Sequence, residues 1–452
     1  MNNYDVVIIG AGPSGLFAAE TLSHENYKVL VIDKKRLAGG AGTQSDGKIV
    51  FHPRVGIEQD ELPLTDEEFK RYTSIIERKF LDCGVDPSKI SDANSVEGIK
   101  LAKKSKKYNL ELLLSKTRHM GTDQAPKIMQ NFKKSLEDKG IEFLMSTGVA
   151  DIIKEEEIFT TTLEDKTEIS STHVMMGPGR GHSEWCRNQA NNLGARYKHG
   201  KIHLGARIEV PKDTLDSITD IAYDAKFYFK SISHNDTVRT FCVNPGGRVA
   251  LESPNDSIKI DGEIYQLING HAKSDNATSN TNLAILVSLP LTEPETDPKE
   301  FLKRVIVNTY ANGGGKPIAQ RWGDLKRGSR SKESTFNNPE RGFDRLTPSL
   351  NPKLFTPGDL SLAYPGRFAS GIVEMIEQID HLVPGFGHPS TLLYLPEVKF
   401  VDTIYLSKGN TMETTLDNLY IMGDGAGKSR GIVGAGLTGI LAAESIINKN
   451  SN

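Results

Sequence analysis

Six residues near the N-terminus have the types and the spacing that bind a dinucleotide. They read Gly10-Ala11-Gly12-Pro13-Ser14-Gly15, a G-x-G-x-x-G motif. In such a motif the first glycine permits a tight turn, the second lets a pyrophosphate approach the backbone, and the third allows a helix to pack closely on a strand. The helix that follows directs its positive end at the phosphates. We therefore expect Gly10, Gly12, Pro13, Ser14 and Gly15 to bind a cofactor.

The motif requires a strand before it and a helix after it, and the sequence predicts both. Residues 5–9 are an apolar run typical of a strand buried in a parallel sheet. Residues 14–23 are rich in alanine and read as a helix, and residues 28–33 form a second strand. That strand ends in Asp33, where a carboxylate accepts hydrogen bonds from a ribose. Lys34 follows directly, and we assign it to the same site.

Glycines gather in three later loops, at residues 39–47, 177–181 and 423–439. A predicted strand at 419–422 runs into the pair Gly423-Asp424. This pattern resembles flavoproteins of the glutathione-reductase-like superfamily, in which such an Asp lies near the ribityl chain of the flavin. The resemblance implies FAD as the cofactor. The loop residues that it assigns to FAD are Gly40, Ala41, Gly42, Ser45, Asp46, Gly47, Gly177, Pro178, Gly179, Gly423, Asp424, Gly434, Ala435, Gly436, Leu437 and Thr438.

The last of these loops is expected to open a helix over residues 440–447. No second helix-opening G-x-G-x-x-G with a ribose-binding acid occurs, so we expect no stably bound pyridine nucleotide. The electron donor is then either NAD(P)H that binds transiently or a ferredoxin-like protein. There is no C-x-x-C pair and no zinc-type ligand spacing, so we predict neither a redox-active disulfide nor a metal site.

Four charged or titratable residues are candidates for catalysis. Lys48 follows the second glycine loop and would stabilise negative charge on a reduced flavin. Arg180 and Arg430 each follow a glycine turn, and an arginine there can hold an anionic substrate. His271 lies in the central part of the chain and is a candidate proton donor. Each of the four also has an ordinary interpretation as a surface or structural residue.

Several longer strings resemble an uncharacterised group of FAD-dependent dehydrogenases of bacteria and archaea. The strings lie at residues 39–48, 177–180, 241–247, 320–325, 396–400 and 423–427. Many members of the group have a cysteine before the Gly-Gly-Ala-Gly loop, where this chain has Leu37-Ala38. The resemblance implies an α/β fold: a Rossmann-type FAD-binding domain with an inserted, mainly-β α+β capping domain over the substrate.

The same reasoning predicts that the FAD-binding domain is interrupted twice. Its three parts are expected at residues 1–60, 118–204 and 398–452. A helical insertion occupies residues 61–117, and the capping domain occupies residues 205–397.

Composition excludes several classes of protein. The 452 residues carry 55 Lys and Arg against 58 Asp and Glu, a net charge of −3, which argues against a chain built to neutralise nucleic-acid phosphates. The one dense basic run lies at residues 103–107, and a solvated helix surface is its ordinary interpretation. We find no run of about 18 apolar residues, so we expect no membrane span. Three cysteines and no leader pattern favour the cytoplasm.

The sequence thus predicts an FAD-dependent oxidoreductase that moves a hydride between flavin N5 and a small-molecule substrate under the cap. Two alternatives stay open. The first is a flavin enzyme that modifies a base of tRNA or rRNA, for which the lysines at 103–107 provide a modest basic patch. The second is an FAD electron-transfer protein that works with a protein partner.

Overall fold

The computed structural model describes residues 2–43, 47–121, 123–252, 258–271, 277–336, 346–400 and 403–450. The chain forms two compact units. Unit 1 consists of Met1–Ile90, Lys116–Lys198 and Thr403–Asn452, and unit 2 consists of Ser91–Ser115 and His199–Asp402. The segment 61–117, expected as one helical insertion, is divided between the units at Ile90.

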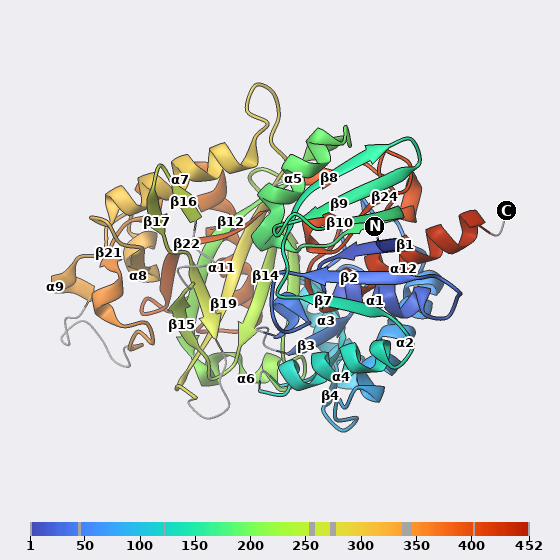
Figure 1. The fold of residues 1–452 in the computed structure, drawn as a ribbon. Helices are drawn as coiled ribbons and strands as arrows, with labels where there is room; N and C mark the ends of the chain where they lie inside the picture. Colours follow the sequence, from blue (N-terminus) through green and yellow to red (C-terminus); the bar gives the residue numbers. More distant parts are fainter. Residues whose placement is uncertain are drawn as a thin grey trace. The chain divides into compact units, whose positions relative to one another are not determined.

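Unit 1 is built on a sheet whose centre is parallel, as the apolar strands predict (Figure 1). Strand β1 lies between β2 and β10 and is parallel to both. The outer strand β7 extends the sheet beyond β2, and β24 pairs with the last residues of β10. The strands of this sheet are β1 (Asn2–Ile9), β2 (Val29–Asp33), β7 (Glu142–Met145), β8 (Val149–Glu155), β9 (Ile158–Leu163), β10 (Glu168–Met176) and β24 (Leu419–Ile421).

Helices complete unit 1, and the helix predicted at residues 14–23 is confirmed as α1. The helices are α1 (Pro13–Leu22), α2 (Asp66–Asp82), α4 (Ala125–Glu137), α5 (Ser183–Asn192) and α12 (Gly431–Asn450), with one-turn 3-10 helices η1 (Gly40–Thr43), η2 (Arg180–His182), η5 (Gly409–Thr411) and η6 (Asp424–Ala426). Small sheets are formed by β3 (Lys48–Phe51), β6 (Lys116–His119) and β4 (Ile90–Asp92), and by β11 (Tyr197–His199) and β23 (Thr403–Tyr405). Helix α2 begins after Thr65, which forms a capping box with Glu68.

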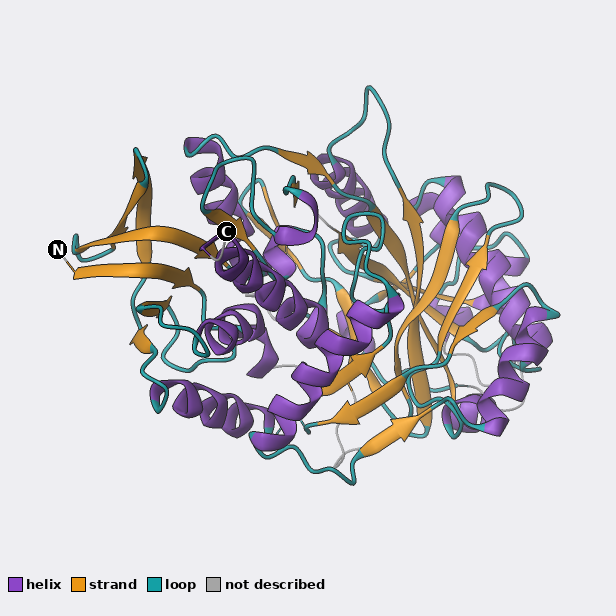
Figure 2. Cartoon of the chain, turned by 90° about the vertical axis from the view of Figure 1, so that its right-hand side faces the viewer, coloured by secondary structure: helices purple, strands orange, loops and turns teal. Residues whose placement is uncertain are grey.

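Helix α12 is longer than the sequence predicts, because it begins at Gly431 rather than at residue 440. It ends at the C-terminal label in Figure 2. In the described part of the chain α12 alone has the length and composition of a membrane span, over Gly431–Lys449, although the sequence led us to expect none. Of its most apolar stretch 78% is buried inside the protein, as in the core helix of a folded domain.

Unit 2 is the mainly-β part of the fold. Its eight-stranded sheet has the order β21-β20-β22-β12-β19-β14-β13-β5. The strands are β5 (Glu111–Leu113), β12 (Ile202–Pro211), β13 (Lys226–Lys230), β14 (Thr237–Asn244), β19 (Asn280–Leu289), β20 (Ile318–Arg321), β21 (Thr356–Pro357) and β22 (Leu392–Phe400). Hairpins are made by β15 (Arg248–Leu251) with β18 (Ile268–His271) and by β16 (Ile258–Ile260) with β17 (Glu263–Tyr265).

Alternation along the strands directs neighbouring side chains to opposite faces of this sheet. On β12 the side chains of Ile202, Leu204 and Ile208 join the apolar core. Arg207 and Glu209 of the same strand are buried on the opposite face. The helices of unit 2 are α3 (Val96–Lys106), α6 (Lys212–Thr219), α7 (Pro298–Asn312), α8 (Trp322–Lys326), α9 (Glu333–Phe336), α10 (Leu360–Ala363) and α11 (Gly366–Leu382). Residues of α7 and α11 pack into the apolar core.

Candidate functional site

The first glycine loop lies between β1 and α1, and its three glycines have different surroundings. Gly10 has φ +107°, and a Cβ placed there would lie 2.3 Å from the Gly177 carbonyl oxygen. A Cβ on Gly15 would lie 1.9 Å from the Gly10 oxygen. Around Gly12, by contrast, no described atom beyond its chain neighbours lies within 4 Å of such a Cβ. Positions 10 and 15 are therefore closed by the protein, whereas position 12 borders open space.

Gly12 is also the N-cap of α1, and no side chain accepts the N–H groups of the first turn. Pro13 occupies the first turn, where its missing N–H costs no hydrogen bond. The N-terminal end of α1 thus presents backbone donors and a partial positive charge beside open space. This is the arrangement that binds a phosphate.

Asp33, at the end of β2, holds this loop in place. Its Oδ2 accepts a hydrogen bond from the Ala11 N–H at 2.7 Å, and its Oδ1 accepts one from the Lys35 N–H at 2.7 Å. Lys34, which the sequence assigned to the same site, forms an exposed ion pair with Glu164 at 2.6 Å. Asp33 therefore lies beside the phosphate loop, as its spacing predicts, and Lys34 pairs with a residue outside the glycine loops.

The glycine loops that are distant in sequence converge on the start of α1. A Cβ on Gly177 would lie 2.9 Å from the Ser14 Oγ, and one on Gly423 would lie 2.6 Å from it. A Cβ on Gly40 would lie 3.2 Å from the Gly12 Cα. Gly177 also donates a hydrogen bond to the Ile9 carbonyl at 2.8 Å, which places its loop at the end of β1. Close approach to the side chain of Ser14 and the backbone of Gly12 is therefore the local reason for these glycines.

The remaining candidate residues of the second and third loops lie in a 3-10 helix, in turns or outside the described residues. Gly42 lies in η1, and a Cβ on it would lie 2.7 Å from the Met129 Cε. Ala41 is exposed in the same turn, and Pro178 follows Gly177. Ser45 and Asp46 lie outside the described residues. Gly47 has φ +73° and accepts a hydrogen bond from the Met120 N–H at 2.7 Å.

The C-terminal Gly-Asp turn is joined to α12 by hydrogen bonds. Gly423 donates to the Thr438 Oγ1 at 2.8 Å, and the Asp424 Oδ2 accepts from the Gly431 N–H at 3.2 Å. A Cβ on Gly425 would lie 3.4 Å from the Gly179 carbonyl oxygen, so this turn also touches the loop after β10. Asp424 therefore sits at the start of α12, beside two of the other loops.

The glycines at 436 and 439 have a packing role within α12, and the expected cofactor role of residues 434–438 stays a prediction. Since α12 already begins at Gly431, Gly434, Ala435, Gly436, Leu437 and Thr438 lie within its first turns. A Cβ on Gly436 would lie 2.7 Å from the Phe17 ring, and one on Gly439 would lie 2.1 Å from the Ser14 carbonyl oxygen. These positions allow α12 to pack tightly on α1.

Sequence reasoning missed two residues next to the Gly-Asp turn. Ser429 is 2% exposed, and within the described residues its Oγ has no hydrogen-bond partner. Lys428 is also buried, its Nζ donates to the Ser407 Oγ, and burial lowers the pKa of its ammonium below the usual range. Their loop pairs with residues 56–58, because Arg430 donates to the Gly56 oxygen at 2.8 Å. This pairing joins their loop to a distant segment, and no local sequence pattern predicts it.

The four catalytic candidates fall on both units. Lys48 begins β3, and Arg430 precedes α12 in unit 1. Arg180 begins η2, also in unit 1. His271 ends β18 of unit 2, where it is exposed and pairs with Arg248 of β15. Three of the four therefore share a unit with the glycine loops, and His271 does not.

The residues present fit a dinucleotide with a flavin. The uncapped start of α1 beside open space at Gly12 suits the pyrophosphate, and Asp33 lies where a ribose is bound. The buried hydroxyl of Ser429 at the start of α12 is a further donor or acceptor that the protein leaves unused within its described part. A search of those same residues for metal sites finds no group of three or more His, Cys, Asp or Glu.

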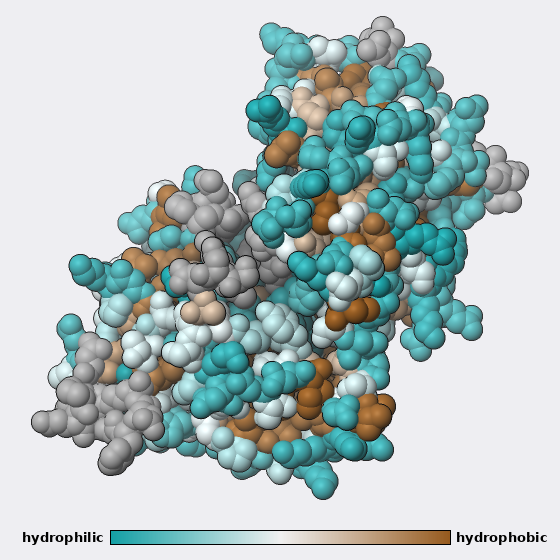
Figure 3. Space-filling view, turned by 90° about the horizontal axis from the view of Figure 1, so that it is seen from below, coloured by the Kyte–Doolittle hydropathy of each residue, from teal (hydrophilic) through white to brown (hydrophobic). Residues whose placement is uncertain are grey.

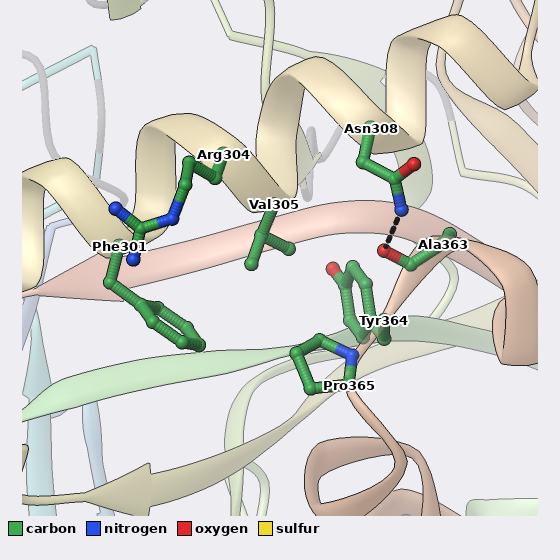
Figure 4. A pocket seen from close by; sticks show the side chains of 7 residues that line it. All are labelled: Phe301, Arg304, Val305, Asn308, Ala363, Tyr364 and Pro365. Atoms are coloured by element: carbon green, nitrogen blue, oxygen red, sulfur yellow. Dashed lines mark hydrogen bonds between the residues drawn. The ribbon is translucent and has the colours of Figure 1, made fainter. Parts of the chain in front are cut away.

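Unit 2 contains a groove of about 320 Å³ of its own, between α7 and the start of α11 (Figure 4). Its walls are mostly apolar, with Arg304 and Asn308 as the polar residues; the lining residues are Phe301, Arg304, Val305, Asn308, Ala363, Tyr364 and Pro365. Arg304 forms an ion pair with Glu295, and Asn308 donates to the Ala363 carbonyl at 3.0 Å. The polar groups of the groove are thus already engaged, and we assign it no chemistry.

The chain is similar to several known proteins. An uncharacterized protein of Clostridium beijerinckii is 23% identical over 98% of this chain and 80% of its own length. A thiamine thiazole synthase of Archaeoglobus fulgidus is 40% identical over 77 residues, 17% of this chain and 28% of that protein. The solved structure of glycine oxidase from Geobacillus kaustophilus is similar over 99% of this chain and 95% of its own, with 13% identity and a TM-score of 0.40.

A family model matches the N-terminal part of the chain. Residues 5–181 match the model of the FAD dependent oxidoreductases (DAO). The matched stretch contains the phosphate loop, Asp33 and the turn at Gly177, which the fold brings together. The expected α/β flavoprotein fold is confirmed, with a Rossmann-type sheet in unit 1 and a mainly-β sheet in unit 2. Over those residues the chain is similar to FAD-dependent oxidoreductases, and FAD is the cofactor that the match implies.

Proposed function

We propose that this chain exchanges a hydride between flavin N5 and a small organic substrate. The observation that carries the proposal is the single dinucleotide site of unit 1, in which the uncapped start of α1, the open space at Gly12 and Asp33 lie together. When bound, FAD supplies two-electron redox chemistry.

The chain's own residues then bind and orient the cofactor. The N–H groups at the start of α1 would hold the pyrophosphate, and Asp33 would accept a hydrogen bond from a ribose hydroxyl. Asp424 and Ser429, both at the start of α12, offer a carboxylate and a hydroxyl to the flavin end. The positive end of α12 would favour negative charge on a reduced ring bound beside it.

Lys48, Arg180 and Arg430 are our candidates for holding an anionic substrate or the charge of the reduced ring. The electron donor that we propose is NAD(P)H bound transiently, or a ferredoxin-like protein, because the sequence has a single G-x-G-x-x-G unit with its acid. We propose that this protein works in the cytoplasm.

The test begins with the purified protein, which is expected to be yellow and to show a flavin absorption band. Anaerobic reduction is then followed by bleaching with NADH, NADPH, reduced ferredoxin and dithionite in separate cuvettes. The reduced protein is finally mixed with panels of small carbonyl, imine and alkene compounds, and reoxidation is recorded.

Rapid bleaching by a nicotinamide followed by reoxidation with one small compound supports the proposal. A protein that takes up no FAD contradicts it. Exchange of electrons with a protein carrier alone, with no small compound reoxidising the flavin, replaces it by the electron-transfer function.

A further inference from the structure

Helix α3 of unit 2 has one buried face and one face that combines lysines with apolar side chains. The buried residues are Gly98, Leu101 and Ser105. The opposite face, defined by the three- and four-residue spacing of a helix, contains Val96, Ile99, Lys100, Lys103, Lys106 and the C-cap Lys107. All six are exposed, Val96 at 63% and Ile99 at 45%. We call these six residues the α3 outer face.

The lysines of the α3 outer face have no acidic partner among the described residues. Among the described residues several other exposed lysines do: Lys326 pairs with Glu377, Lys34 with Glu164 and Lys212 with Asp216. Glu97 is the one acidic residue in the first turn of α3. The whole chain has a net charge of −3, so this helix is a local concentration of positive charge on a slightly acidic protein.

Helix stability explains part of this pattern. Positive side chains in the last turn interact favourably with the helix dipole, and Lys103, Lys104 and Lys106 lie in that turn. The dipole gives no reason for exposing Val96 and Ile99 in line with the lysines. Most of the face in Figure 3 is hydrophilic with small apolar areas between, so single exposed apolar residues are ordinary. Their alignment with unpaired lysines on one helix face is the feature that needs a cause.

The composition of this face distinguishes among anionic partners. Sites for nucleic acids use arginine forks and exposed aromatic rings, and protein interfaces concentrate energy in Trp, Tyr and Arg. The α3 outer face has none of these, and the nearby Tyr108 is half-buried against the His381 ring at 6.0 Å. Flexible lysines beside aliphatic residues suit a fluid anionic surface, in which aliphatic groups enter the headgroup layer while ammonium groups stay at its phosphates.

We propose that the α3 outer face docks unit 2 on an anionic phospholipid membrane, as a peripheral contact that does not span the bilayer. Each lysine near such a surface contributes about 1 kcal/mol, a factor of about five in affinity, and Val96 and Ile99 add an apolar contribution. The interaction is screened by salt, since the Debye length falls to about 3 Å at 1 M.

The test uses the full-length, FAD-loaded protein in flotation with vesicles of phosphatidylcholine alone or with about one third phosphatidylglycerol. We expect binding only to the mixed vesicles, with loss on raising the salt to about 0.5 M. The triple variant Lys103→Gln, Lys106→Gln and Lys107→Gln is expected to bind about a hundredfold more weakly. The pair Val96→Ser and Ile99→Ser is expected to weaken binding about tenfold and to keep the salt dependence.

The matched control changes three exposed lysines elsewhere on unit 2, Lys230→Gln, Lys316→Gln and Lys353→Gln, which alters the net charge equally. It is expected to bind as the unchanged protein does. Circular dichroism verifies that each variant is folded. Equal binding to both vesicle types, or equal loss in the control triple, overturns the proposal. Binding to an RNA that depends on the α3 lysines, with no binding to vesicles, overturns it in favour of a nucleic-acid partner.

Discussion

Arg207 and Glu397 face each other across strands β12 and β22 and form a two-pronged ion pair inside unit 2. The Arg207 Nε lies 3.1 Å from one carboxylate oxygen of Glu397, the Nη2 lies 3.1 Å from the other, and neither side chain is exposed. The Nη1 donates to the Cys242 carbonyl at 3.1 Å and to the Asn282 Oδ1 at 3.2 Å. This buried pair anchors a polar layer on one face of the eight-stranded sheet.

Glu397→Ala is expected to destabilise unit 2 by about 3–5 kcal/mol, because it leaves the Arg207 charge buried without its partner. Urea unfolding measures the loss, with the fluorescence of Trp322 in unit 2 as the signal and Trp185 of unit 1 replaced by Phe. The control is Glu377→Ala, which breaks an exposed pair with Lys326 and is expected to cost less than about 1 kcal/mol. Equal effects of the two substitutions would show that the buried pair has no special role.

Substitution by alanine is expected to have opposite effects at Gly10 and Gly12: it lowers stability at Gly10 and FAD affinity at Gly12. Gly12→Ala leaves the fold intact, because φ is −76° and the added Cβ meets open space, but it blocks the approach of the pyrophosphate. FAD affinity, measured by equilibrium titration of the apoprotein, is expected to fall tenfold to about a hundredfold.

Gly10→Ala is the counterpart. Its Cβ would lie 2.3 Å from the Gly177 oxygen at φ +107°, so thermal unfolding of the apoprotein is expected to show a loss of about 3 kcal/mol. If Gly12→Ala instead destabilised the apoprotein as much as Gly10→Ala, the open space at position 12 would be structural rather than a binding feature.

Much of unit 1 could be predicted from local sequence. The run at β1, the motif and Asp33 each have a physical signature within a few residues, and the structure confirms the order strand, helix, strand. The start of α12 was predicted wrongly because glycine is normally a sign of a loop. Its glycines lie inside the helix, since Phe17 and Ser14 of α1 leave no room for a side chain at Gly436 and Gly439.

What could not be predicted depends on contacts between distant segments. Burial of Ser429 results from the pairing of its loop with residues 56–58. The division of segment 61–117 follows from β5, whose residues pair with β13 of the unit 2 sheet. The polar layer around Arg207 could not be predicted from the sequence either, because an arginine in a strand is usually exposed.

Ser429→Ala tests whether the buried hydroxyl serves the cofactor. Removing a buried hydroxyl that has no partner in the described structure is expected to leave the apoprotein equally stable or more stable by about 1 kcal/mol. FAD affinity is expected to fall about threefold to tenfold, since one hydrogen bond is lost. The exposed Ser74 of α2, changed to Ala, serves as the control for both measurements. A less stable apoprotein with unchanged FAD affinity would assign Ser429 a purely structural role.

His173 on β10 predicts a dependence of stability on pH. The side chain is 5% exposed, and burial lowers the pKa of its imidazole to about 4. Below the ordinary pKa of 6.5, His173 binds a proton in the unfolded chain but stays neutral in the folded protein. The contribution of His173 to stability is therefore complete above pH 6.5 and falls as the pH drops toward 4. Between pH 6.5 and pH 5 the loss is about 2 kcal/mol. His173→Phe is expected to remove this part of the pH dependence of the free energy of unfolding. Urea unfolding measures it, with the fluorescence of Trp185 in unit 1 as the signal and Trp322 replaced by Phe. The control is His24→Phe at an exposed position, which is expected to leave the dependence unchanged. Parallel stability curves for the His173→Phe variant and the unchanged protein over this range would contradict the prediction.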